Sequence, residues 1–395
     1  ESKKNKFIEF VEKFKEVSKN LITHPYIEKN INYISFSIIL LILIIVRIQN
    51  PEFVKSISSI SFDSYQKIFK YNEKQDDIVI VDIDEPSLAK FGQFPWGRNV
   101  FSKILENINK ENPKSIGFDI FFSEKDKQSP EEIIKTYSIK DPDIKNALKS
   151  IKGHDEKFQK TLKETKSVLA VFGSLVPTKG TYNRKGKARI FAKGGNVKNY
   201  VYNYKHSLGS IPILEKNSKG LGSINYITQN DAVVRSLPMI MVFNNKLFPS
   251  FGLEMIRVGE KKRSIITNLN DSGIKNVSIK PYEFKTDKNS LIWVKYNRSI
   301  NDNFISAEKV FNNEFDNKFF RDKYVLIGAS AKGLFDTVKI PTGETVPGVQ
   351  VHANVIDNLL KNNFLKRNDE IFIFELIVSI LISVVAFVIS QRIKP

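Results

Sequence analysis

The sequence predicts a mixed α/β fold, in which a mainly parallel sheet is flanked by helices and an apolar helix lies near each end of the chain. Three short runs rich in Ile, Val and Phe are typical of strands buried on both faces, as in parallel sheets covered by helices. They are Ile78–Val81, Ile116–Phe118 and Tyr324–Ile327. Two longer apolar runs, Ile31–Val46 and Ile371–Ile389, indicate helices that span a membrane.

Between the apolar runs, helical and extended patterns alternate. The segment Ser87–Asn109 has a helical pattern and joins the first two strands, which predicts a βαβ unit. The stretch Leu221–Phe243 predicts two strands around a turn at Gln229–Asp231. The other predicted elements are a strand at Val168–Phe172, strands within Ser278–Tyr296, and helices at Val100–Ile108, Glu131–Tyr137, Phe158–Lys163, Pro249–Val258 and Pro347–Leu360.

The first apolar run has three interpretations: a membrane anchor, a buried core helix or a signal peptide. A signal peptide is followed by small residues at a cleavage site, whereas this run continues with RIQNPE. Arg47 can extend its guanidinium to the lipid headgroups. We therefore expect an uncleaved anchor. The second run is interrupted only by Glu375, close to its start, where a charge costs less than at the bilayer centre.

Two spans of opposite direction place both termini on one side of a membrane. Lys and Arg before the first span and after the second favour cytoplasmic termini. The predicted organisation is a cytoplasmic juxtamembrane helix (1–30), a span (31–48), an extracytoplasmic domain (49–370), a second span (371–391) and the start of a further segment (392–395). The Lys-rich first helix could alternatively lie on an anionic membrane surface.

Composition excludes several function classes. The net charge is +18, but no helix-turn-helix, zinc-finger or RNA-binding aromatic motif accompanies it, so we expect no nucleic-acid partner. The chain contains no Cys, which excludes disulfides, thiolate metal sites and Cys nucleophiles. No G-x-S-x-G motif and no metal-ligand His spacing is present among its four His, so we expect no catalytic residue.

Acidic residues follow the predicted strands. If these strands are parallel neighbours, their carboxyl ends share one edge of the sheet, where α/β folds usually bind ligands. Carboxylate oxygens suit Mg²⁺ or Ca²⁺, so Asp82, Asp84 and Asp119 are candidate metal ligands. The candidate ligand-binding residues at this edge are Asp82, Asp84, Trp96, Arg98, Asp119, Lys332, Asp336 and His352.

A second interpretation of these acids is structural. Asp84 precedes Glu85-Pro86, a sequence typical of a helix N-cap followed by proline in the first turn. A cluster of buried carboxylates also needs a counter-charge, which would come from a cation or from Arg98 and Lys332. His352 lies in a helical pattern, where a packed or hydrogen-bonded role is the alternative to ligand binding.

The stretch Ser174–His206 contains eight Lys and Arg and no acidic residue. It predicts either a surface that attracts anionic ligands or lipid headgroups, or a solvated loop or hairpin in a Lys-rich protein. The candidate residues for an anionic surface are Lys179, Arg184, Lys185, Lys187 and Arg189.

Several ordered blocks resemble the type-2 CHASE domain, a sensory extracellular domain associated with cyclases and histidine kinases. The first blocks are DIVIVDIDEPSLAKFGQFPWGRNVFSKIL and KSIGFDIFFSE. Later blocks are Gly222–Pro238, Pro249–Glu254, YVLIGASAKGLFDTVKIP and VPGVQVHANVIDNLL, so the resemblance covers roughly Ile78–Leu360. The segments Asp126–His154 and Ser174–His206 are longer than the usual connections of this family.

The resemblance implies an input domain in the bacterial inner membrane that dimerises and passes a signal to a cytoplasmic effector. The chain contains neither a G-x-x-x-x-G-K-[ST] nor an H-R-D motif. We therefore expect a piece of a longer receptor, with a class III adenylate or guanylate cyclase beyond Pro395 that would use Mg²⁺ or Mn²⁺ and ATP or GTP. The alternatives are a histidine or Ser/Thr kinase effector, and a non-signalling membrane scaffold. A metal-dependent hydrolase would require the acids to converge on an ion.

Overall fold

The computed structural model describes residues 25–177, 181–334, 336–365 and 369–392. The chain divides into two compact units, one formed by residues 1–61 and 367–395 and the other by residues 62–366. Most of the predicted juxtamembrane helix lies outside the described residues, as do residues 393–395. The predicted mixed α/β fold is confirmed for residues 62–366, where all the strands of the described residues lie.

The first unit contains two apolar helices, α2 (Pro25–Gln49) and α13 (Asp369–Arg392). Within them, Asn30–Gln49 and Phe372–Arg392 are long and apolar enough to cross a membrane, and neither stretch is buried. Phe36 stacks on Phe387 with ring centroids 4.3 Å apart, and Arg47 forms an ion pair with Glu375. These contacts pair the two helices antiparallel. The carboxylate that interrupts the second apolar run therefore has a cationic partner.

The central sheet of the second unit is mainly parallel, as predicted. Its strand order is β16-β1-β17-β2-β3, and β7 and β6 both pair with β3. The strand β17 lies between β1 and β2, although it is far from both in sequence, so these two strands are not direct neighbours. All pairs are parallel except β3 with β6. The bounds are β1 Ile78–Ile83, β2 Ser115–Phe118, β3 Ser167–Ser174, β6 His206–Leu208, β7 Gly220–Ser223, β16 Phe304–Ser306 and β17 Tyr324–Ala329.

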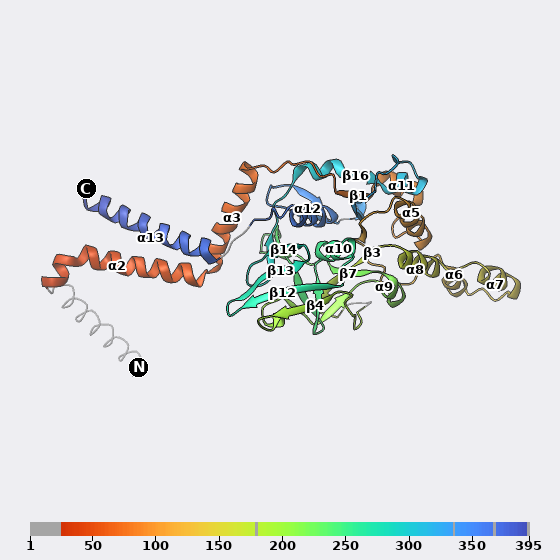
Figure 1. Ribbon diagram of the computed structural model, residues 1–395, viewed down its shortest axis with the longest axis horizontal. Coiled ribbons are helices and arrows are strands. Elements are labelled where there is room, and N and C mark those ends of the chain that lie inside the picture. Colours follow the sequence, from red (N-terminus) through yellow and green to blue (C-terminus); the bar gives the residue numbers. More distant parts are fainter. Residues whose placement is uncertain (1–24, 178–180, 335, 366–368, 393–395) are drawn as a thin grey trace, which may run out of the picture. The chain divides into compact units, whose positions relative to one another are not determined.

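Helices cover both faces of this sheet (Figure 1). Alternate residues of β1 belong to different cores, because Ile78 and Ile80 face one side and Val79 and Val81 the other. The first side packs against α10 (Phe251–Gly259) and α12 (Gly348–Leu360). The second side packs against α4 (Glu85–Phe91), α5 (Arg98–Lys110), α8 (His154–Glu164), α9 (Pro212–Asn217) and α11 (Ala307–Asn312).

Close contact with the sheet sets the position of α12. A Cβ atom at Gly328, in β17, would lie 2.5 Å from Cβ of Val349 in the first turn of α12. Only a glycine permits this approach. The start of α12 is therefore held at the carboxyl end of the central strands.

Smaller sheets complete the second unit, and they correct two predictions. Leu221–Phe243 contains four strands of three sheets rather than two strands. The predicted turn at Gln229–Asp231 does join two antiparallel strands, β8 and β9, but β7 belongs to the central sheet, and Met239 separates β9 from β10, which pairs with other partners. The basic stretch Ser174–His206 is not simply a loop, since it contributes strands to two sheets. The sheets are β14-β13-β12-β4, β11-β10-β5, β15-β9-β8 and β18-β19.

The bounds of these strands are β4 Arg189–Lys193, β5 Asn203–Tyr204, β8 Ile227–Thr228, β9 Val234–Pro238, β10 Ile240–Phe243, β11 Lys246–Pro249, β12 Ser264–Asn270, β13 Gly273–Ile279, β14 Tyr282–Lys285, β15 Leu291–Trp293, β18 Thr337–Lys339 and β19 Thr345–Pro347. The remaining helices are α3 Glu52–Ile68, α6 Pro130–Thr136, α7 Pro142–Lys149 and the short 3-10 helices η1 Val197–Asn199, η2 Arg298–Asn303 and η3 Lys332–Leu334.

Candidate functional site

Two cavities lie at the carboxyl end of the central strands, where ligands were predicted. The segment 119–128, which follows β2, contributes to both. The larger, about 480 Å³, is lined by Asp119, Asp336 and His352 and is called the His352 cavity. The smaller, about 340 Å³, is lined by Trp96 and Arg98 and is called the Trp96 cavity. The predicted ligand-binding residues are therefore divided between two sites.

His352 lies in the second turn of α12 and is only 2% exposed. Its ring meets Phe251 of α10 edge-on, with centroids 5.4 Å apart. No hydrogen-bond partner is found for its Nδ1 atom among the residues that the structure describes. Burial lowers the pKa of this imidazole to about 4, so it is neutral at physiological pH. His352 is therefore an uncharged polar group with an unused hydrogen-bonding position beside a cavity.

Asp119 is the first residue after β2, and its backbone N–H donates to the carbonyl of Ile327 over 2.9 Å. This bond extends the ladder between β2 and β17 and holds the carboxyl at the edge of the sheet. Burial, together with the negative charge of Asp336, raises the pKa of Asp119 to about 8. Asp336 is more exposed, and its backbone carbonyl accepts a hydrogen bond of 3.0 Å from Gly348 at the start of α12.

The rest of the His352 cavity is aromatic and polar. Phe172, Tyr204 and Tyr226 line it, and burial raises the pKa of both tyrosines. Asn225 supports the end of β3, because its side chain accepts from the N–H of Gly173 over 2.7 Å and donates to its carbonyl over 3.0 Å. No Lys or Arg lines this cavity among the described residues, although the chain carries a net charge of +18.

Asp82 and Asp84 do not join Asp119. Asp82 accepts a hydrogen bond of 2.6 Å from Ser330, and burial raises its pKa to about 6. Asp84 is the N-cap of α4 and accepts from the N–H of Ser87 over 3.0 Å. The structural interpretation of Asp84 is therefore confirmed. Residues 25–177, 181–334, 336–365 and 369–392 contain no group of three or more His, Cys, Asp or Glu side chains that could hold a metal ion. The predicted convergence of the three Asp on Mg²⁺ or Ca²⁺ is not found.

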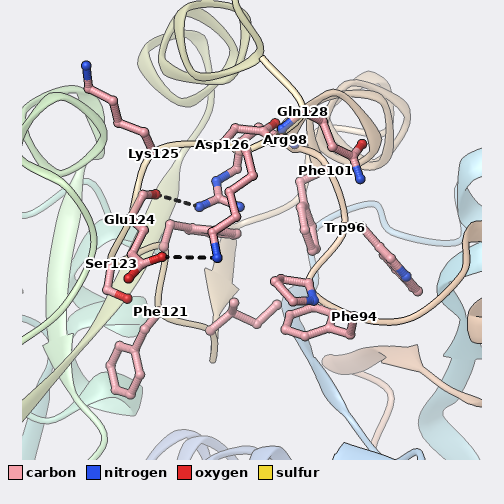
Figure 2. Close-up of a pocket in the computed structure, with 14 residues that line it drawn as sticks. Phe94, Trp96, Arg98, Phe101, Phe121, Ser123, Glu124, Lys125, Asp126 and Gln128 are labelled. Atoms are coloured by element: carbon pink, nitrogen blue, oxygen red, sulfur yellow. Dashed lines mark hydrogen bonds and ion pairs between the residues drawn. The ribbon is translucent and has the colours of Figure 1, made fainter. Parts of the chain in front are cut away.

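Arg98 was expected to balance the acids that follow β1 and β2, but it pairs with residues of the longer connection after β2 (Figure 2). Its backbone N–H donates to Asp126 over 2.7 Å, and its guanidinium donates to the carbonyl of Glu124 over 2.9 Å. The guanidinium lies 3.6 Å from the carboxylate of Asp155 and 4.7 Å from the centre of the Phe122 ring. Burial lowers the pKa of Arg98, and the neighbouring acids oppose this effect.

Two acidic residues that pair with Arg98 were not predicted, namely Asp126 and Asp155. Asp126 also accepts from the N–H of Gln128 over 2.8 Å and lies 3.0 Å from Nδ1 of His154. No motif marks these residues, because they lie in a segment of ordinary charged composition. Trp96 is 2% exposed, and its indole N–H donates to the carbonyl of Gly92 over 2.8 Å. The charged groups of the Trp96 cavity thus hold the segment 119–128 against α5 and α8.

The remaining predicted residues lie elsewhere. Lys332 is exposed and lines neither cavity, and its backbone N–H donates to Glu85 over 3.1 Å. The prediction that Arg184 belongs to a surface for anions is wrong, because this residue is buried and forms an ion pair of 2.8 Å with Glu215. Lys187 is half-buried, and its ammonium donates to the carbonyl of Lys216 over 2.9 Å. Lys185 and Arg189 are exposed, and Lys179 lies outside the described residues.

Comparison with protein families gives one match, to the CHASE2 domain, over residues 38–389. The match includes the whole second unit, the second half of α2 and most of α13. Comparisons with curated proteins and with solved structures give no match.

Proposed function

The chain belongs to the CHASE2 family, whose members are sensory extracellular domains of cyclase- and kinase-associated receptors, and we propose on this premise that it binds its signal in the His352 cavity. One observation carries the proposal. The helix α12 lines the His352 cavity with its first turns, and its last turn belongs to a polar network around the segment 71–75.

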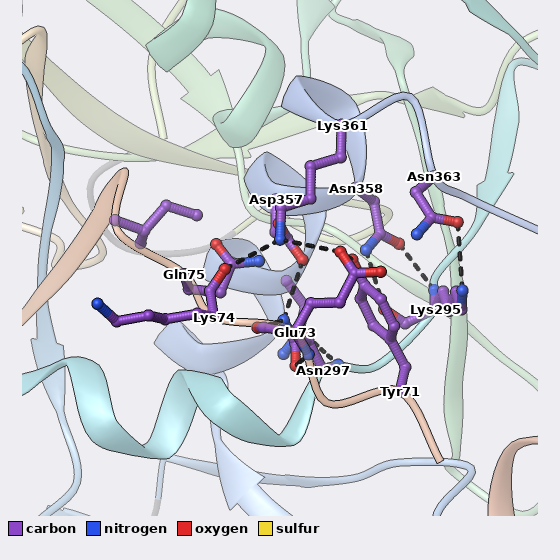
Figure 3. Close-up of polar contacts among 12 residues, drawn as sticks. Tyr71, Glu73, Lys74, Gln75, Lys295, Asn297, Asp357, Asn358, Lys361 and Asn363 are labelled. Atoms are coloured by element: carbon purple, nitrogen blue, oxygen red, sulfur yellow. Dashed lines mark hydrogen bonds and ion pairs between the residues drawn. The ribbon is translucent and has the colours of Figure 1, made fainter. Parts of the chain in front are cut away.

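This polar network is shown in Figure 3. The ammonium of Lys361, which follows α12, lies 3.3 Å from Asp357 and 3.4 Å from Glu73. It also donates to the carbonyl of Lys74 over 3.1 Å. The hydroxyl of Tyr71 donates to the same Glu73 carboxylate over 3.0 Å. The end of α12 is thus bonded to the chain between α3 and β1.

Amide side chains extend the network to residues 295–297. Asn358 accepts from the N–H of Lys295 over 2.7 Å and donates to its carbonyl over 2.9 Å. Asn297 donates from its backbone N–H to Asn354 over 2.6 Å and from its side chain to the carbonyl of Glu73 over 2.7 Å. Because these bonds join groups that are largely buried, a shift of α12 requires residues 71–75 and 295–297 to move with it or to break them.

The last residues of α3 are attached to the same region. The side chain of Gln66 donates to the carbonyl of Val294 over 2.9 Å and accepts from the N–H of Tyr296 over 3.0 Å. Arg235 holds Asp63 with two hydrogen bonds of 2.8 and 2.7 Å. Residues 62–68 would therefore follow a displacement of the segment 294–297. This continuity supports a path from the cavity through α12 to residues 62–68 of α3, which follows the first apolar helix in the chain.

The proposal also includes the membrane topology of the chain and the effector that it regulates. Residues 49–370 lie outside the cytoplasm of a bacterial inner membrane, and α2 and α13 span that membrane as an antiparallel pair. The receptor acts as a homodimer and regulates a class III adenylate or guanylate cyclase encoded after Pro395. The antiparallel contacts of α2 and α13 support the topology, because they leave the start of α2 and the end of α13 on one side.

Cysteine labelling tests the topology, since the native chain contains no Cys. Tyr137 is 75% exposed, so a Tyr137→Cys variant should react with a membrane-impermeant maleimide in intact spheroplasts. A Lys13→Cys variant should react only after the membrane is opened, and the Cys-free parent should not react in either case. Labelling of Lys13→Cys in intact spheroplasts would reject the proposed topology.

The effector is tested by reading the coding sequence beyond Pro395 and by measuring cyclic nucleotide synthesis in membranes that contain the whole protein. An Asp119→Asn variant should change the rate of synthesis, whereas Asp302→Asn, at an exposed position outside both cavities, should not. If the coding sequence contains a kinase domain in place of the cyclase, the receptor regulates a kinase instead. A coding sequence that ends without any effector would favour the scaffold.

A further inference from the structure

We propose that the His352 cavity selects a small organic cation, whose ammonium group binds Asp119 and Asp336 while its carbon skeleton packs on the aromatic side chains. The inference rests on the proposed function only in taking this cavity as the ligand site. It names the chemical class of the ligand.

The charge of the cavity is the first argument. Two carboxyl groups line it, and no Lys or Arg does so among the described residues, in a chain whose Lys and Arg outnumber its acids by 61 to 43. Burial is the main cause of the raised pKa of Asp119, and repulsion by the negative charge of Asp336 adds to it. A bound cation relieves this repulsion, whereas an anion would add to it.

His352 supplies an independent observation. A buried polar atom without a hydrogen-bond partner is unfavourable. The side chain of His352 is only 2% exposed, and its Nδ1 atom has no partner among the described residues. A neutral imidazole accepts a hydrogen bond at its unprotonated nitrogen, so an N–H group of a ligand would satisfy Nδ1 in the tautomer that carries its proton on Nε2. This second feature points to a ligand that donates hydrogen bonds, as an ammonium group does.

The size and walls of the cavity favour an organic cation over a metal ion. Asp119, Asp336 and His352 line one cavity but do not form a group that could hold a metal ion. A volume of about 480 Å³ lies in the range of sites for small organic molecules. Phe172, Tyr204 and Tyr226 line the cavity with aromatic side chains, whose ring faces attract cations.

Binding should be coupled to proton release. Asp119 is largely protonated at neutral pH, and the titratable groups that share its cavity are Asp336, Tyr204, Tyr226 and the neutral His352. An ammonium beside Asp119 favours its ionised form, so the carboxyl loses a proton as the ligand binds. Affinity for an amine should therefore rise with pH up to about 8, where Asp119 is ionised before binding.

The test is calorimetric titration of the full chain in lipid nanodiscs with methylammonium, putrescine and tyramine at millimolar concentrations. At least one amine should bind, and tyramine should bind at least about tenfold more tightly than tyrosol, which carries a hydroxyl in place of the ammonium. Titration in two buffers with different ionisation enthalpies should show net proton release near neutral pH.

Matched variants locate the site. Asp119→Asn and Asp336→Asn should each weaken amine binding by about tenfold or more, and Asp119→Asn should also abolish the proton release. Asp302→Asn, which removes an exposed carboxylate elsewhere, should bind the amine as the unmodified chain does. Asp119→Asn keeps the shape of the side chain, and a thermal melt shows whether it folds.

Three results would overturn the inference: no binding of any of the three amines, equal binding of tyramine and tyrosol, or binding of Ca²⁺ or Zn²⁺ that depends on Asp119 and excludes amines. These results are distinguishable from failure of the proposed function. An amine that binds through Asp119 without changing the output of the whole receptor would uphold the ligand class and reject the sensory role of the cavity.

Discussion

The two cavities at the edge of the sheet share one segment, residues 119–128, but differ in how their charged groups are paired. In the Trp96 cavity, Arg98 contacts two acids and a backbone carbonyl, and Asp126 accepts hydrogen bonds from two backbone N–H groups. In the His352 cavity, the buried imidazole has an Nδ1 atom without a hydrogen-bond partner among the described residues. The buried Nε of Arg98 and Oδ1 of Asp155 also form no hydrogen bond there, but they face each other as an ion pair of 3.6 Å. Paired charges stabilise the fold, whereas unpaired polar groups are available to a ligand. The difference supports the proposal that the His352 cavity is the functional one.

The largest expected effect on stability is in the Trp96 cavity, where the charged groups are paired. Arg98→Met removes the charge but keeps much of the side-chain volume, so Asp155 loses its cationic neighbour and the carbonyl of Glu124 loses a donor. The free energy of unfolding should fall by about 3 kcal/mol, as when one partner of a buried ion pair is removed. Urea unfolding followed by circular dichroism would measure this. A loss below about 1 kcal/mol would show that the pairing contributes little to stability.

His352 should have a smaller effect that depends on pH. Its pKa is about 4 in the folded protein against 6.5 in the unfolded chain, so the unfolded state binds more protons between these values and stability falls as the pH drops from 6.5 to 4. His352→Leu should remove this loss. The free energy of unfolding of the variant, relative to wild type, should therefore be about 1–2 kcal/mol higher at pH of about 5 than at pH of about 8. Parallel pH profiles for the two proteins would contradict the burial of a neutral imidazole.

Asp119 should show the opposite dependence. Its pKa is about 8 in the folded protein against 3.8 in the unfolded chain, so the folded state binds more protons and stability falls as the pH rises from 3.8 to 8. Asp119→Asn should therefore stabilise the protein at pH of about 8, by about 1 kcal/mol because the carboxyl is partly open to solvent. Chemical unfolding of both proteins at two pH values would measure the gain. Destabilisation by Asp119→Asn would mean that the carboxylate has a structural partner.

The smallest expected effect is at the far end of α12. Lys361 is 29% exposed, so Lys361→Met should cost only about 0.5 kcal/mol of stability. The same change should strongly weaken the coupling between the His352 cavity and the segment 71–75, because Lys361 joins Asp357 to Glu73 and Lys74. Receptor output should then respond less to changes in the His352 cavity. An unchanged response would exclude this contact from the path.

Much of the fold was predictable because the buried strands leave a local signal. Ile78–Val81 and Tyr324–Ile327 are continuous apolar runs, and both are central strands. The difference in charge pairing between the Trp96 cavity and the His352 cavity could not be predicted from such local signals. Asp84 and Asp119 both follow apolar strands, yet the first caps α4 and the second faces a cavity. The difference depends on which helix the chain enters next and on packing against α12, which is distant in sequence.

The residues that decide the charge pairing were the least predictable. Asp126 and Asp155 belong to a connection without a motif, and their contacts with Arg98 arise only when α8 packs beside α5. The edge of the sheet as a site was predictable from topology alone, since parallel strands end together. The choice of Asp119, Asp336 and His352 among the acidic and polar candidates needed the three-dimensional arrangement.

The most direct test of the account fills each cavity in turn and compares hydrogen exchange. Since the native chain has no Cys, Ser174→Cys in the His352 cavity and Gln128→Cys in the Trp96 cavity can each be modified with a benzyl methanethiosulfonate after folding. Modification at residue 174 should change exchange at residues 71–75 and 357–361, whereas modification at residue 128 should change exchange only nearby, around residues 94–101. If the adduct at residue 174 leaves residues 71–75 unchanged, or if both adducts change them equally, the His352 cavity is not the sensory site.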